Sequence, residues 1–465
     1  MAEPPSDDDS SSAAIVAVAK DGDVVLDVTF QTSRETLRLT RKTTAAPGGA
    51  RQLPSNAPPT LRPSLTVAFR VRLATLQRES KYFANLLGNE QFAEAGRIAA
   101  AHAELAESGV DPGAAHAGQL PRVAITDDDE ATQSAGREHA FEDMLRLVHG
   151  KPPRAAQVAM PHVVTLAIMA DRFDCLGAVA RAALREFKYK WPMPAARPLP
   201  AKSPGTGAVD VEQIQRQKVL VAWLLGMPNR LQQACRELIM QGSRLWSPYA
   251  DVDMADKTQY WWALPDGLEQ ELQYRRECVL NTVASIQKHF LNLYLSKERQ
   301  CKLGYDSSGA CDSFQLGQMI KFLTSKKLAF LVDFSPSSLD DDVADSSRLD
   351  IDQLLQALRQ APNYQIDKHH TNCGLRIRID PILDYVSAML SASVVSISLA
   401  EWRKNRADVS WAQAENESRH GAGKTFLFTR ALANDQRLRF EGHMYANKMA
   451  RELFTASAWD WTPEL

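Results

Sequence analysis

The chain has 465 residues, of which 45% are hydrophobic and 24% charged, and its formal net charge is -2. This length predicts two domains rather than one core, and the composition is that of a soluble globular protein. The nearly balanced charge argues against direct nucleic-acid binding and against an anionic membrane surface.

The first residues and the cysteines indicate the cellular compartment. Met1–Ser12 is acidic and polar, unlike a secretory signal. No window approaches the ~18 uninterrupted apolar residues that a membrane span needs. Six cysteines in so long a chain, without an export signal, are typical of reduced thiols. We therefore expect a cytoplasmic or nuclear protein with no membrane association.

Residues 21–190 are expected to form one domain, preceded by a disordered tail at 1–20. Gly22–Phe30 predicts a strand that opens on a turn. Val67–Leu87 first alternates as a strand does and then repeats its apolar residues at helical spacing, with Ser80 placed to cap the second short helix. A strand, a helix and a final helix pair are then expected in Pro121–Asp129, Ala140–Gly150 and His162–Gly177.

Two inserts interrupt this domain, near residues 42–64 and 96–119. The first is rich in Pro, Gly and Ser, which predicts a mobile excursion. Alternating leucines just before it predict that Glu35–Arg41 lengthens the first strand as a hairpin. The second insert is rich in alanine and predicts a short helix over Ile98–Glu107.

Five prolines in residues 191–208 forbid a helix and predict an extended linker. Residues 209–465 then indicate a mainly helical domain. Its strongest signal is one apolar face that runs from Leu268 to Leu293 in steps of three, four or seven residues. Other helices are expected around Leu220–Leu225, Arg230–Met240, Phe314–Leu331, Leu349–Arg359 and Ile382–Lys404, and the tail after Val409 is ambiguous.

Three cysteines and one histidine are candidate metal ligands. Cys301 and Cys311 frame a loop with Gly and Ser, and His370 and Cys373 stand together some sixty residues later. Zinc prefers four Cys or His ligands in a tetrahedron, so these residues predict either a closed structural site or, as an alternative, a zinc-dependent enzyme. Four protein ligands leave no open position, which favours structure over catalysis. The competing interpretation is that the cysteines are small buried hydrophobic side chains.

Other chemical motifs give no site. Gly421–Thr425 resembles the end of a phosphate-binding loop, but Ser418 occupies the place of a required glycine and no apolar strand precedes it. Asp127–Asp129 and Asp340–Asp342 are interpreted as solvated turns rather than calcium ligands. No catalytic set of residues can be assigned from spacing.

The order of segments in residues 21–190 resembles the BTB/POZ domain. The carriers of the resemblance are the Asp-Val-Val strand at Asp23, the Phe-x-Val strand at Phe69, the Ser-x-Tyr-Phe helix at Ser80 and the Phe-Glu-x-x-Leu-Arg helix at Phe141. The resemblance implies an α+β fold, a small sheet capped by a helical cluster, followed here by the mainly α-helical domain. The C-terminal half is similar to that of fungal BTB-domain proteins of unassigned function.

The resemblance also implies a protein–protein interaction module rather than an enzyme. The residues of its interaction surface would be Asp23, Val24, Leu26, Leu76, Phe83 and Leu87. Asp23 matches an acidic pocket residue of BTB repressors, whereas Leu73 stands where the pocket arginine is expected. We expect a homodimeric adaptor or scaffold that docks protein partners. Recruitment of a cullin-3 ubiquitin ligase and assembly of another complex are alternative roles.

Overall fold

The chain divides into two compact units, described here from a computed structural model. The N-terminal unit comprises residues 1–227 and 258–263, and the C-terminal unit comprises residues 228–257 and 264–465. The division lies at residues 227–228 rather than within 191–208, because the helix over Val211–Leu224 packs in the N-terminal unit. The structure describes residues 15–45, 62–155, 157–186, 191, 211–247, 263–301, 303, 308–328, 347, 349–371, 373–412, 424–433, 435 and 442–461.

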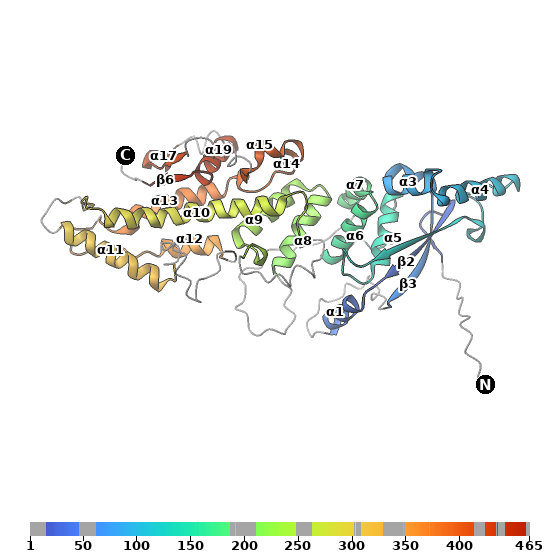
Figure 1. The fold of residues 1–465 in the computed structure, drawn as a ribbon, viewed down its shortest axis with the longest axis horizontal. Helices are drawn as coiled ribbons and strands as arrows, with labels where there is room; N and C mark the ends of the chain where they lie inside the picture. Colours follow the sequence, from blue (N-terminus) through green and yellow to red (C-terminus); the bar gives the residue numbers. More distant parts are fainter. Residues whose placement is uncertain are drawn as a thin grey trace. The chain divides into compact units, whose positions relative to one another are not determined.

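The N-terminal unit combines a four-stranded mixed sheet with a set of helices (Figure 1). Apart from α1, strands and helices follow one another in the order that the sequence predicts between residues 21 and 190. The elements are β1 (Val16–Ala17), β2 (Val24–Gln31), α1 (Arg34–Ala45), β3 (Ser64–Val71), α2 (Leu73–Glu79), α3 (Lys81–Gly88), α4 (Ala93–Glu107), η1 (Ala117–Gln119), β4 (Arg122–Asp128), α5 (Arg137–Val148), α6 (Met160–Arg172), α7 (Leu176–Glu186) and α8 (Val211–Leu224).

The sheet has the strand order β1-β3-β2-β4. Strands β2 and β3 pair antiparallel along their whole length, with Leu26 opposite Phe69. Strand β4 runs parallel to β2 on its other side, and the short β1 runs parallel to β3. The expectation that Gly22–Phe30 and Val67–Val71 belong to one sheet is thereby confirmed.

Helices cover both faces of this sheet. On one face Phe141 of α5 contacts Phe30 and Phe69, with ring centroids 5.8 and 5.4 Å apart. Phe173 joins the same cluster and stacks on Phe83 of α3. These rings are large apolar surfaces removed from water, so they dominate the core of the unit. The opposite face is covered by α4 and the segment after it, through the buried residues Val25, Ala68, Leu105, Ala115 and Leu120.

Ser80 caps α3 as the sequence predicts. Its hydroxyl oxygen accepts a hydrogen bond from the Phe83 N–H at 3.0 Å and donates one to the Phe173 carbonyl at 2.7 Å. A capping hydroxyl satisfies a backbone donor that the first turn of a helix leaves without a partner. The same side chain therefore starts α3 and ties it to the end of α6.

His149, directly after α5, is held in one neutral tautomer. Its Nε2 lies 3.1 Å from the Arg72 N–H and must accept that hydrogen bond, while Nδ1 lies 2.8 Å from the Leu145 carbonyl and must donate. Burial is the largest cause that lowers the pKa of His149. Protonation of His149 Nε2 would place its new N–H against the Arg72 N–H, which also disfavours the charged imidazole and agrees with a lowered pKa.

The hairpin predicted over Glu35–Arg41 is wrong, because this segment is part of α1. The Ser33 side chain accepts from the Thr36 N–H at 3.2 Å, and the Ser33 carbonyl accepts from the Leu37 N–H, which starts a helix. Leu37 is buried on the inner face of this helix, whereas Leu39 is exposed. The alternating leucines therefore reflect helix faces rather than a strand.

Two further expectations for this unit have different outcomes. The tail predicted to be disordered over residues 1–20 is corrected for residues 15–20, because β1 pairs with β3. The helix predicted over Ile98–Glu107 is confirmed as α4. Most of the insert near 42–64, the linker over 191–208 apart from Trp191, and the segments Asp340–Asp342 and Gly421–Gly423 lie outside the described residues.

The C-terminal unit is built around α10, the long helix that the apolar face from Leu268 to Leu293 predicts (Figure 1). Helix α10 contacts α9, α11, α19 and β6. Strands β5 and β6 pair parallel in a separate small sheet. The elements are α9 (Pro228–Gln241), η2 (Arg244–Trp246), α10 (Leu268–Leu295), α11 (Ser308–Ser325), α12 (Ile351–Arg359), α13 (Leu375–Leu390), η6 (Ser393–Val395), α14 (Leu399–Lys404), α15 (Arg406–Val409), β5 (Thr425–Leu427), α17 (Arg430–Ala433), α19 (Gly442–Phe454) and β6 (Ala458–Asp460).

The helix predicted over Ile382–Lys404 is interrupted. Helix α13 ends at Leu390, and α14 begins only at Leu399. The segment between them is rich in Ser and Val. Val loses side-chain freedom in a helix, and Ser competes for the backbone hydrogen bonds of a helix. Carbonyl groups of this segment accept hydrogen bonds from Arg275 of α10 instead, at 2.9 Å for Val394 and 2.6 Å for Ser396.

A buried ion pair joins α10 to the segment after α15. Arg275 Nε lies 2.7 Å from Glu271 Oε1, one turn away on the same helix. The Glu271 carboxylate also accepts from the Ser410 hydroxyl at 2.7 Å and from the Trp411 N–H at 2.8 Å. The Arg275 guanidinium lies 4.9 Å from the Trp411 ring centroid. Every charge of this pair is hydrogen-bonded, as a buried pair requires.

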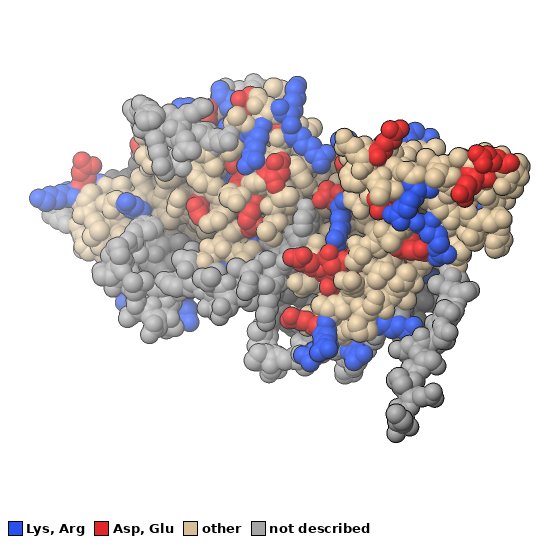
Figure 2. Space-filling view, turned by 45° about the vertical axis from the view of Figure 1, so that its right-hand side comes forward, with Lys and Arg blue, Asp and Glu red and all other residues tan. Residues whose placement is uncertain are grey.

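The surface carries charges of both signs. On the face that Figure 2 shows, Lys and Arg side chains are interspersed with Asp and Glu. This distribution agrees with the formal net charge of -2. Within the part of the chain that the structure describes, no helix has the length and apolar character needed to cross a bilayer.

Candidate functional site

The apolar residues predicted to form an interaction surface lie in the core of the N-terminal unit. All five are buried, so the prediction that they face a partner is corrected. The reason is that β2 is covered on both faces and that α2 and α3 turn their apolar sides toward α5 and Phe173. The residues concerned are Val24, Leu26, Leu76, Phe83 and Leu87.

Asp23 is half-buried and has a structural contact. Its Oδ1 accepts from the Leu73 N–H at 2.7 Å, at the first residue of α2. The carboxylate therefore supplies the acceptor that the start of this helix needs. The neighbouring Arg72 forms an ion pair with Asp21. Asp23 thus holds the helix after β3 rather than lining a charged pocket.

The acidic run Asp127–Asp129 is only partly the solvated turn that the sequence predicts. Asp127 is buried and lies 2.7 Å from Arg137 Nε, and Asp129 accepts from the Ser33 hydroxyl at 2.9 Å. Burial raises the pKa of Asp127, and its hydrogen bond with Arg137 opposes that shift. These carboxylates join the sheet to α5 and α1, which excludes them as calcium ligands facing solvent.

Three of the four predicted metal ligands, Cys301, Cys311 and His370, come together in the C-terminal unit, and the fourth, Cys373, lies next to Cys301. Cys301 lies in the segment after α10, Cys311 in the first turn of α11, and His370 and Cys373 between α12 and α13. The ligand atoms of Cys301, Cys311 and His370 all lie within 4.8 Å of one another. Cys373 Sγ lies 3.8 Å from Cys301 Sγ, and the three cysteines form one buried cluster.

Asp367 orients the imidazole of this cluster. Its Oδ1 accepts from His370 Nδ1 at 2.7 Å and from the backbone N–H groups of His369 at 2.8 Å and His370 at 3.2 Å. His370 is 1% exposed, and its Nε2 has no hydrogen-bond partner in the structure. The hydrogen bond from Nδ1 leaves the lone pair of the neutral imidazole on Nε2.

Hydrogen bonds between backbone and side chains fix the segments that carry the cysteines. Arg378 of α13 donates to the Gln300 carbonyl at 2.8 Å, and the Gln300 N–H donates to Asp312 of α11 at 2.9 Å. Gln315 of α11 donates to the Tyr364 carbonyl at 3.0 Å. These bonds link the three segments independently of the cysteines, so the cluster is held in place by its surroundings.

Burial and neighbouring thiols act together on the ionisation of the cluster. Burial is the main cause that raises the pKa of Cys311, and the nearby Cys373 and Cys301 thiols raise it further. Negative charge on three adjacent sulfur atoms is unfavourable unless a cation offsets it. Sulfur and imidazole nitrogen are the ligand types that a soft cation such as zinc prefers.

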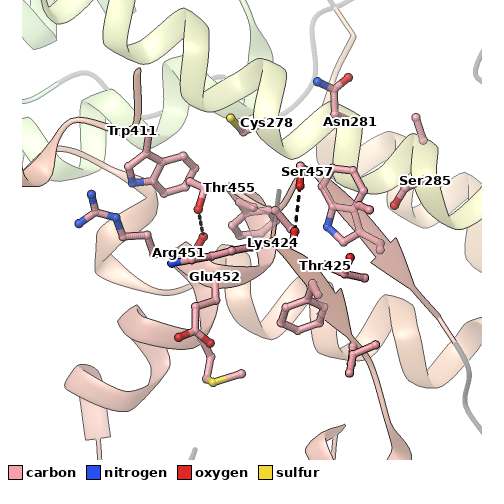
Figure 3. A pocket seen from close by; sticks show the side chains of 18 of the residues that line it. Cys278, Asn281, Ser285, Trp411, Lys424, Thr425, Arg451, Glu452, Thr455 and Ser457 are labelled. Atoms are coloured by element: carbon pink, nitrogen blue, oxygen red, sulfur yellow. Dashed lines mark hydrogen bonds between the residues drawn. The ribbon is translucent and has the colours of Figure 1, made fainter. Parts of the chain in front are cut away.

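A second candidate is a large open pocket among α10, β5, α19 and β6, of about 2270 Å³ (Figure 3). The polar groups that Figure 3 shows there are partly engaged by backbone. The Thr455 hydroxyl donates to the Arg451 carbonyl at 2.7 Å, and the Ser457 hydroxyl donates to the Lys424 carbonyl at 3.1 Å. Lys424, the last basic residue of the rejected phosphate-loop motif, lies at this edge beside β5.

Sequence reasoning found the four side chains of the cluster but missed two features. Asp367 carries a signal, because it stands three residues before His370, the spacing at which its carboxylate can reach the imidazole within one turn. The pocket carries none, because its walls come from segments more than a hundred residues apart, such as α10 and α19. No family model, no curated protein and no solved structure matches the chain.

Proposed function

We propose that the protein is a non-enzymatic adaptor whose N-terminal unit is a BTB-type interaction module. The observation that carries the proposal is the topology of the sheet and the helices after it. The antiparallel pair of β2 and β3 leads into the helix pair α2 and α3, and β4 runs parallel to β2 before α5, α6 and α7. This is the order of elements on which the BTB resemblance of the sequence rests.

The partner surface is assigned to the outer sides of α3 and of the turn before α4, because the inner sides are buried. Two large aromatic side chains remain exposed there, Tyr82 at 37% and Phe92 at 42%. Aromatic residues are enriched in protein interfaces, where they supply much of the binding energy. We assign this surface to contact with a second copy of the chain, which the sequence predicts as a homodimer.

Light scattering on the full-length protein tests this proposal. We expect a dimer at micromolar concentration, and a shift toward monomer when Tyr82→Ala and Phe92→Ala are combined. Met444→Ala is the matched control, since it removes an exposed apolar side chain from the other unit. A wild-type protein that stays monomeric would remove self-association from the proposal, and equal effects of the control would remove this surface.

The role of the adaptor is decided by its partner. The sequence leaves two roles open, recruitment of a ubiquitin ligase and assembly of another complex. Co-elution of purified cullin-3 with the full-length protein would identify the first. Failure to bind cullin-3 would favour a scaffold for another complex. The alternative of a zinc-dependent enzyme is not favoured, because the four clustered side chains would occupy every position of a tetrahedral ion.

A further inference from the structure

The spacing of the sulfur atoms agrees with a shared metal ion. With Zn–S bonds of about 2.3 Å in a tetrahedron, two sulfur ligands lie about 3.8 Å apart. The Sγ atoms of Cys301 and Cys373 are 3.8 Å apart, and none of the six cysteines, all of which are described, is in a disulfide. The distance is far longer than the about 2.05 Å of a disulfide bond.

The imidazole supplies an independent observation. A nitrogen that is buried without a hydrogen bond costs free energy, so such an atom in a native structure requires an explanation. His370 Nε2 is such an atom, and one nitrogen of this imidazole lies within 4.8 Å of the Cys301 and Cys311 sulfur atoms. Its other nitrogen is bound to Asp367 at 2.7 Å, which is the carboxylate–histidine arrangement that orients zinc ligands.

From these contacts the geometry points to a structural zinc site formed by Cys301, Cys311, His370 and Cys373. Three sulfur ligands and one imidazole in a tetrahedron select zinc over magnesium or calcium, which take oxygen ligands.

The site would fasten three connections of the C-terminal unit to one another. Its ligands come from the segment after α10, from α11 and from the segment between α12 and α13. Since all four positions are protein side chains, the ion has no vacant position for a substrate, and its role is structural. Asp367 acts as a positioning residue through His370. This inference does not depend on the adaptor function of the N-terminal unit.

Metal analysis of the full-length protein, purified with reductant and without chelator, tests the site. We expect one zinc ion per chain, and loss of that zinc in Cys373→Ser. Cys278→Ser is the matched control, because Cys278 is a buried cysteine of the same unit outside the cluster. Sub-stoichiometric zinc in protein from zinc-supplemented cells would overturn the proposal, as would stoichiometric iron or equal zinc loss in the control.

Two measurements avoid variants that fail to fold. Wild-type protein loaded with Co²⁺ is expected to show the intense visible bands of a tetrahedral ion with thiolate ligands, and a weak octahedral spectrum would overturn the site. Asp367→Asn is expected to weaken zinc affinity about 10- to 100-fold in competition with a chelator. Asp384→Asn, which removes an exposed carboxylate of α13 that pairs with Arg359, should leave the affinity unchanged. Equal affinities of both variants would contradict the positioning role of Asp367.

Discussion

The buried pair of Glu271 and Arg275 makes the sharpest prediction about stability. Glu271→Gln keeps the shape of the side chain but leaves the Arg275 guanidinium charged and without its counterion. Burial lowers the pKa of Arg275, whereas the Glu271 charge raises it, so the carboxylate is what keeps this cation favourable. Removing one partner of a buried ion pair costs about 3–5 kcal/mol.

Urea or thermal unfolding followed by tryptophan fluorescence measures this cost. The signal reports on the relevant unit, because Trp402, Trp411 and Trp461 are all buried in it. For a unit of this size, 1 kcal/mol lowers the melting temperature by about 2–4 °C, so Glu271→Gln should lower it by about 6–20 °C.

An exposed pair with the same spacing provides the control. Arg376 and Asp380 lie one turn apart on α13 at 3.4 Å, with side chains 51% and 37% exposed. Solvent screens such a pair, so Asp380→Asn should cost less than about 0.5 kcal/mol. A cost for Glu271→Gln that is no larger than that of Asp380→Asn would refute the reasoning, because burial would then have no effect on the pair.

Three other predictions follow from individual contacts. Phe141→Ala should cost about 3–5 kcal/mol because it empties the centre of the aromatic cluster. Met444→Ala, at an exposed side chain, should cost less than about 0.5 kcal/mol, and denaturant midpoints measure both. The pKa of His149 is lowered in the folded state, so the stabilising effect of the neutral imidazole is present above pH 6.5 and is lost as the pH falls through the folded pKa. His149→Gln should therefore make the urea midpoint depend less on pH below pH 6.5. Gly242 has φ +80, and a Cβ added there would collide with a backbone carbonyl, so Gly242→Ala should destabilise the protein by more than about 1 kcal/mol. Gly317 faces open space within α11, so Gly317→Ala should stabilise the protein by about 0.5–1 kcal/mol. Similar melting temperatures of the two variants would contradict both assignments.

Local patterns predicted the elements well where one periodicity dominated. The apolar face from Leu268 to Leu293 gave α10, and the change of period within Val67–Leu87 gave β3, α2 and α3. The prediction over Glu35–Arg41 was wrong because only two leucines defined the period, and the contact of Ser33 with Asp129, ninety-six residues away, lies beyond any local pattern. The break after Leu390 likewise depends on Arg275 of another helix.

The direction in which apolar residues face was the weaker part of the prediction. A sequence shows that Val24 and Leu26 are apolar, but an apolar side chain fits a core and a dimer surface equally well. Only the three-dimensional arrangement shows that helices cover both faces of β2 and leave Tyr82 and Phe92 outside. The proximity of Cys301, Cys311 and His370 was predicted from their ligand chemistry, although Cys311 lies in α11 rather than in a loop.

The competing interpretation of that cluster, a packing of small hydrophobic side chains, differs from the proposed metal site in the free energy that it supplies. Burying three thiols contributes only about 1 kcal/mol each, by analogy with a methylene group. It also leaves the buried Nε2 of His370 without a partner, which costs about 1–3 kcal/mol. A structural zinc ion contributes about 10–16 kcal/mol in small peptides and satisfies the same nitrogen. The proposed metal therefore accounts for the imidazole and its carboxylate as well as for the cysteines, whereas hydrophobic packing accounts for the cysteines and their 3.8 Å spacing alone.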